Sequence, residues 1–65
     1  MNVKEIKKRL IDEDMTQTRL AEKIGVPKQQ LNNVLHGLKK NPRIIKALEI
    51  YEETGKAVNY MRVKL

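Results

Sequence analysis

The sequence predicts an all-α protein: a small bundle of four helices, with a fifth helix as one alternative for the last ten residues. Apolar residues recur at three- and four-residue spacing through most of the chain, which is typical of amphipathic helices. Phe and Trp are absent, so Leu, Ile, Val, Ala and Met must fill the core, which favours helices over a β-sandwich. With 65 residues the chain forms one domain, whose folding removes only about 60% of the unfolded surface from water.

The first helix is expected over residues 3–13. Asn2 can cap its first turn, and Glu5 at the third helical position can accept a hydrogen bond from the backbone of Asn2 in return. The basic run 4–9 is expected to form a solvated face. The acidic run 12–14 ends the helix, because the macrodipole disfavours negative charge there. The apolar residues at helical spacing are Val3, Ile6, Leu10 and Ile11.

A short second helix and a tight turn follow. Thr16 can cap this helix, and Met15 before it can pack onto Leu20 inside the helix. Gly25 suits the positive φ found at a helix C-terminus, and Pro27 redirects the chain before a further helix begins. The residues expected to be buried in the second helix are Leu20, Ala21 and Ile24.

Asn41 and Pro42 start a fourth helix, because Asn caps well and Pro suits the first helical position. Gly55 should end it. The last ten residues are ambiguous, because their apolar residues alternate as in a β-strand but would also suit one or two helical turns. We favour an extended arm and divide the chain into residues 1–55 and a C-terminal arm, residues 56–65. The fourth helix is expected to bury Ile44, Ala47, Leu48 and Tyr51.

The third helix, residues 28–36, carries amides and no acidic residue. With the second helix and the Gly-containing turn it forms a helix-turn-helix arrangement. Leu31 and Val34 turn inward, and Gly37 ends the helix. An exposed α-helix of this kind fits the DNA major groove, where amides can pair with adenine and Lys can donate to guanine. The predicted base contacts are therefore Lys28, Gln29, Asn32 and Asn33.

Residues 15–43 resemble the Cro and phage-repressor helix-turn-helix family. The resemblance is carried by Thr16-Gln17, Leu20-Ala21, Ile24-Gly25-Val26, Leu31, Val34, Gly37 and Pro42-Arg43. It implies base reading by the same four residues of the third helix. It also implies contacts to DNA phosphates by Thr16, Gln17, Lys39, Lys40 and Arg43.

The chain departs from the family pattern at two places. Pro27 stands where a Ser or Thr usually caps the third helix, so a side-chain acceptor is lost there. Leu10 and Leu35 stand where family members often pair an Arg with a Glu, and we predict that these leucines touch. An apolar pair avoids the cost of desolvating two charges.

The chain has 14 Lys and Arg against 8 Asp and Glu, a net charge of +6 that would attract a polyanion. We expect a sequence-specific regulator that binds double-stranded DNA as a homodimer on a pseudo-palindromic operator, with recognition helices about 34 Å apart. The dimer contact is expected at Ile50 and the arm, with Val58, Tyr60, Met61, Val63 and Leu65. The alternatives are a protein-interaction or antirepressor module, and an architectural DNA-binding protein.

Other functions lack support in the sequence. Cys and Ser are absent and there is one His, so we expect no enzyme, no cofactor and no metal ion. No apolar run approaches the about 20 residues of a membrane span. We expect a cytoplasmic protein of a bacterial host, associated with the nucleoid.

Overall fold

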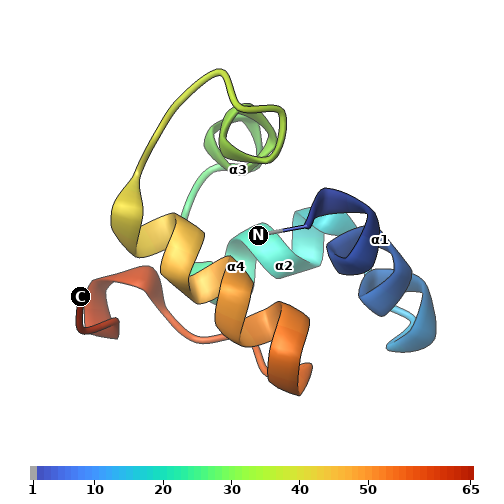
Figure 1. Cartoon of the computed structure of the whole chain (residues 1–65). Helices are drawn as coiled ribbons and strands as arrows, with labels where there is room; N and C mark the ends of the chain where they lie inside the picture. Colours follow the sequence, from blue (N-terminus) through green and yellow to red (C-terminus); the bar gives the residue numbers. More distant parts are fainter. Residues whose placement is uncertain (1) are drawn as a thin grey trace.

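The computed structural model describes residues 2–65, and these form four α-helices and one 3-10 helix (Figure 1). The predicted all-α fold is confirmed, and the helix bounds agree with the expected ones to within one residue. No β-strand occurs in residues 2–65. The elements are α1 (Val3–Asp12), α2 (Gln17–Ile24), α3 (Lys28–Leu35), α4 (Pro42–Thr54) and η1 (Tyr60–Arg62).

Side-chain caps begin three of the four α-helices, as predicted. Asn2 Oδ1 accepts from the backbone N–H groups of Lys4 and Glu5, at 3.0 and 3.3 Å. Thr16 and Asn41 cap α2 and α4 in the same way. The predicted hydrogen bond from the Asn2 N–H to the Glu5 side chain does not form. The Asn2 N–H donates instead to the carboxylate of Glu52 on α4, 3.2 Å away. The first turn of α1 is thus completed by a distant helix.

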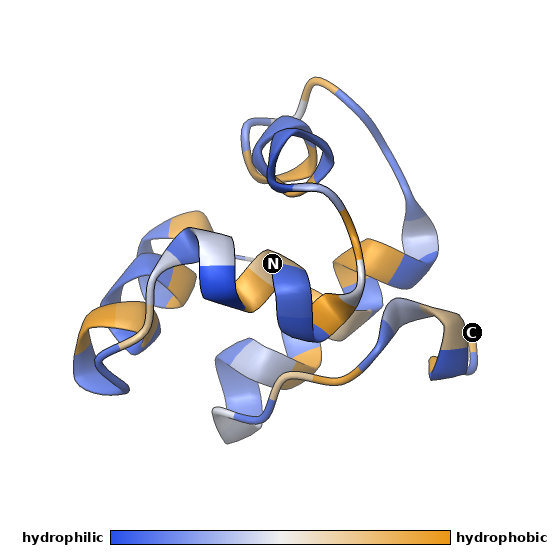
Figure 2. Cartoon of the chain, turned by 180° about the vertical axis from the view of Figure 1, so that it is seen from behind, coloured by the Kyte–Doolittle hydropathy of each residue, from blue (hydrophilic) through white to orange (hydrophobic). Residues whose placement is uncertain are grey.

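One apolar core joins the four helices, and in Figure 2 hydrophobic and hydrophilic segments alternate along them as expected of helices with one buried face. Leu10 and Leu35 are both buried in this core, as their apolar character requires, and Met15 packs against it. Ile11 does not belong to the core, contrary to the spacing argument: it is 79% exposed. The buried face of α1 is centred on Ile6 and Leu10, and the next residue lies about 100° further round the helix.

The basic run on α1 is not wholly a solvated face. Arg9 is half-buried, and its Nη2 donates to the backbone oxygens of Glu52 and Glu53, at 3.0 and 3.4 Å. These oxygens lie in the last turn of α4, where carbonyl groups have no partner within the helix. Nη1 also lies 3.9 Å from Glu13 Oε1. Arg9 therefore fastens α1 to the end of α4.

The C-terminal tail, residues 56–65, folds back onto the chain and is not the extended arm that we favoured. It leaves α4 at Gly55, forms η1 and returns to α4, where Val63 is 5% exposed and belongs to the core. Asn59 Oδ1 caps η1 by accepting from the Met61 N–H at 2.9 Å. Val63 is thus buried within its own chain. This burial removes its apolar surface from water without a second subunit.

None of the helices described over residues 2–65 is long and apolar enough to cross a membrane.

Candidate nucleic-acid interface

A tight turn sets the angle between α2 and α3. Gly25 has φ 92°, in the left-handed region, and its N–H donates to the Ala21 oxygen at 2.8 Å. Val26 is buried. Pro27 then begins α3 as its N-cap and, as the sequence indicated, supplies no side-chain hydrogen bond. The tail packs against this turn, since a Cβ at residue 25 would lie 2.7 Å from Asn59 Nδ2.

The orientation of α3 agrees with the predicted recognition face. The apolar side of the helix is buried in the core through Leu31, Val34 and Leu35. Lys28 and Gln29 are exposed. Asn32 and Asn33 are half-buried, so both remain partly open to solvent. Figure 1 shows α3 at one edge of the molecule, with the loop to α4 beside it.

The amides of this face are held by one another. Gln17 Nε2, at the start of α2, donates to Asn32 Oδ1 at 3.2 Å. Gln29 Nε2 donates to Asn33 Oδ1 at 3.1 Å, one helical turn further along α3. Each Asn keeps a second lone pair on its oxygen and both hydrogens on its nitrogen. The two bonds therefore orient the Asn side chains without exhausting their hydrogen-bonding capacity.

The loop after α3 carries the next group of cations. Gly37 has φ 74° and lets the chain fold back, so that the N–H of Leu38 donates to the Asn33 oxygen at 2.8 Å and that of Gly37 to Val34 at 3.1 Å. This is the Schellman pattern of a helix C-terminus. Lys39 and Lys40, which follow it, are both exposed.

The expected phosphate contacts differ in how they are placed. Thr16 is exposed and its hydroxyl oxygen caps α2, accepting from the Arg19 N–H at 3.2 Å. Gln17 is half-buried beside Asn32. Arg43 is turned toward the tail, where Nη1 donates to the backbone oxygen of Val63 at 2.6 Å. The structure therefore brings Gln17 to the recognition face and ties Arg43 to the tail.

The charge of this region is of one sign. From Gly25 to Leu48 the chain has five Lys or Arg residues and no Asp or Glu. Among the described residues, no group of three or more His, Cys, Asp or Glu side chains could hold a metal ion. The surface offers cations and amides, which suit a polyanion with hydrogen-bonding edges.

A sequence model of the helix-turn-helix family matches residues 6–60, most of the chain. The chain belongs to this family. No curated protein and no solved structure matches the chain. The family consists of regulators that bind double-stranded DNA and is generally not enzymatic, so the helix-turn-helix protein is a DNA-binding regulator.

Sequence reasoning missed how the residues of this helix-turn-helix are joined. It assigned Gln17 to the DNA backbone and Asn32 to the bases, without a bond between them. It also gave Asn59 no role, although Asn59 packs against the turn. The spacing of residues within each helix contains no signal for such contacts, because they depend on how two elements pack.

Proposed function

We propose that this helix-turn-helix protein is a Cro-like repressor that reads an operator through the major groove with α3. The observation that carries the proposal is the outward face of α3, where Lys28 and three amide side chains lie together. Two of the amides, on Asn32 and Asn33, are already oriented by hydrogen bonds. An ordered side chain loses less entropy when it binds a base.

The base contacts follow from the chemistry of the groove. Asn32, Asn33 and Gln29 can each donate to the ring nitrogen of adenine and accept from its amino group, while Lys28 donates to guanine. Each well-formed pair contributes about 1–3 kcal/mol of discrimination against the wrong base. A carboxylate on this face would be repelled by the flanking phosphates, and residues 28–36 contain none.

Phosphate contacts would fix the position of α3 in the groove. Gln17 has one further amide hydrogen and its oxygen free, so it can bind a phosphate while it holds Asn32. Thr16, Lys39 and Lys40 are exposed to solvent. Arg43 can contribute through the donors of its guanidinium that do not bind Val63. Such contacts position the protein and carry no direct sequence information.

A homodimer would let two copies of α3 read a pseudo-palindrome. One short helix contacts few base pairs, and two-fold partners place their recognition helices about 34 Å apart, one turn of DNA. Met61 and Leu65 are 67% and 75% exposed, and they offer an apolar contact for the second copy. Sedimentation should show a dimer with operator DNA, whereas a strict monomer with and without DNA would exclude this part of the proposal.

Selection of bound sites from a random DNA library tests the proposed function. We expect an enriched sequence with two-fold symmetry, bound at least ~10³-fold more tightly than random DNA. Enrichment of no sequence, with salt-dependent binding to all DNA, would favour an architectural protein. Weak binding to every DNA would favour a protein-interaction or antirepressor module. The expected site of action is the cytoplasm of a bacterial host.

A further inference from the structure

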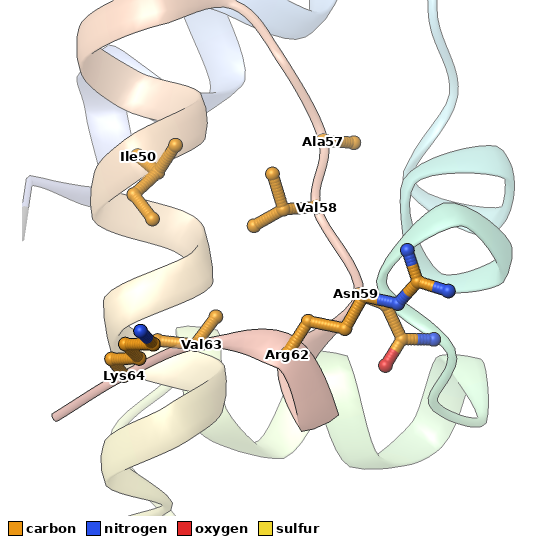
Figure 3. A pocket seen from close by; sticks show the side chains of 7 residues that line it. All are labelled: Ile50, Ala57, Val58, Asn59, Arg62, Val63 and Lys64. Carbon is orange, nitrogen blue, oxygen red and sulfur yellow. The ribbon is translucent and has the colours of Figure 1, made fainter.

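A groove of about 560 Å³ lies between α4 and the C-terminal tail (Figure 3). In Figure 3 Ile50 points from α4 toward Val58 on the tail, with Arg62 and Lys64 below them. The apolar part of the wall comes from Ile50, Ala57, Val58 and Val63. The volume falls within the about 300–1,000 Å³ of ordinary ligand sites.

The groove is held open by contacts at both ends of the tail. At one end Asn59 packs against Gly25 and caps η1 with its side-chain oxygen. At the other end Val63 is buried in the core and its backbone oxygen binds Arg43 at 2.6 Å. Because both anchors are made within the chain, an occupant would not have to order the tail when it binds.

The charge around the groove is positive. Arg62 and Lys64 line it and are exposed, and none of the described residues that line it is acidic. The tail as a whole, residues 56–65, has no Asp or Glu. Arg62 and Lys64 lie on the tail and not on α3, so they are not among the predicted base contacts. They are available to a partner other than the DNA read by α3.

We propose that this groove binds an acidic amphipathic peptide segment of a partner protein. An apolar side chain of the peptide fills the space between Ile50 and Val58, and neighbouring carboxylates pair with Arg62 and Lys64. A second copy of this chain fits less well. Met61 and Leu65, the contact proposed for the homodimer, do not line the groove. A two-fold contact centred on the groove itself would bring Arg62 and Lys64 of both copies together, and like charges facing each other disfavour binding.

The test uses the full chain and a displayed library of random peptides. We expect enrichment of peptides in which Asp or Glu flanks Leu, Ile or Met, with NMR shifts at Ile50 and Val58 when a synthetic copy binds. Arg62→Glu with Lys64→Glu should weaken that binding about tenfold or more. Lys4→Glu with Lys7→Glu, an equal change of charge on the exposed side of α1, should leave it unchanged.

Several results would overturn the proposal. One is a selection that enriches no peptide, or only peptides without carboxylates. Another is equal binding of the enriched peptide by both charge variants. Octanoate that reproduces the shifts at the same affinity would assign the groove to a small anionic amphiphile. Self-association of the chain through Ile50 and Val58 would assign it to a second copy. Circular dichroism should show that both variants keep the helical fold.

Discussion

At the scale of single residues, Tyr51 is the most unusual side chain of the core. It is fully buried, and its hydroxyl has no hydrogen-bond partner among the described residues. Burial raises the pKa of this phenol above its ordinary value of 10.0, and the carboxylate of Glu13 raises it further, while Arg9 lowers it. A buried polar group without a partner reduces stability.

Because of Tyr51, the free energy of unfolding should depend on pH in the alkaline range. Between pH 10.0 and the raised pKa, the folded chain keeps a proton that the unfolded chain has lost, so the free energy of unfolding falls as pH rises. In urea titrations Tyr51→Phe should remove this fall. At neutral pH the variant should be as stable as the wild type, or more stable by about 1 kcal/mol, since an unsatisfied hydroxyl is removed. The control is Tyr60→Phe, and an alkaline fall that persists in Tyr51→Phe would contradict the assignment.

The bond between Gln17 and Asn32 predicts that these residues act together on DNA. We expect that Gln17→Ala and Asn32→Ala each weaken operator binding, and that their effects are not additive. A double-mutant cycle should give a coupling of about 0.5–3 kcal/mol, as found for residues in contact. Gln17→Ala with Lys40→Ala is the matched control, since no bond joins that pair. Additive effects for Gln17 and Asn32 would show that the bond plays no part in recognition.

At the scale of elements, α1 and α4 are joined by polar contacts at their ends. Asn2 binds the Glu52 carboxylate, and Arg9 binds the backbone oxygens of Glu52 and Glu53. These contacts supply hydrogen-bond partners to backbone groups at helix ends, which have no partner within their own helix. They also bring the positive guanidinium to the negative end of the α4 dipole, where a cation is stabilising.

Arg9 should therefore matter more to stability than its basic neighbours. We expect Arg9→Ala to lower the free energy of unfolding by about 1–3 kcal/mol, because hydrogen bonds to charged groups are lost. Lys8→Ala, on an exposed neighbour of the same helix, should change it by no more than about 0.5 kcal/mol. Chemical denaturation measures both. Equal effects of the two substitutions would mean that the Arg9 contacts do not stabilise α4.

The helices themselves could be predicted from the sequence because their determinants are local. Asn2, Thr16 and Asn41 cap as expected, and Gly25 and Gly55 adopt positive φ at helix ends. What could not be predicted lies between elements. Ile11 has helical spacing but no element packs over it, and the tail turns inward at Val63 although its alternation suggested a strand. Local spacing does not determine which distant surface a residue meets.

At the scale of the whole molecule, both of the candidate binding surfaces carry exposed cations. One includes α3 and the loop with Lys39 and Lys40, and the other is the tail beside α4. The outward side of α3 could be predicted from the sequence, because Leu31 and Val34 fix which side of the helix is buried, and the base contacts on it stay a prediction. The sequence grouped Ile50, Val58 and Val63 as an expected dimer contact but gave no sign of a groove, since the space between α4 and the tail depends on how the two pack.

Substitution of Lys40 tests whether the surface formed by α3 and the loop after it binds DNA. If Lys40 neutralises one phosphate, Lys40→Ala should reduce the slope of log affinity against log salt by about 0.9 and weaken all DNA sequences alike. Lys4→Ala, on α1, should leave the slope unchanged. Fluorescence anisotropy at several salt concentrations measures the slope. An unchanged slope for Lys40→Ala would remove this residue from the DNA contact.

The central claim is that the outward face of α3 reads bases. The most direct measurement compares sites selected from a random DNA library by the wild type and by Asn33→Ala. The account predicts that Asn33→Ala loses the preference at one base pair in each half-site, about 1–3 kcal/mol, while the other positions keep theirs. An identical consensus from both proteins, or uniformly weaker binding without any change of preference, would contradict it.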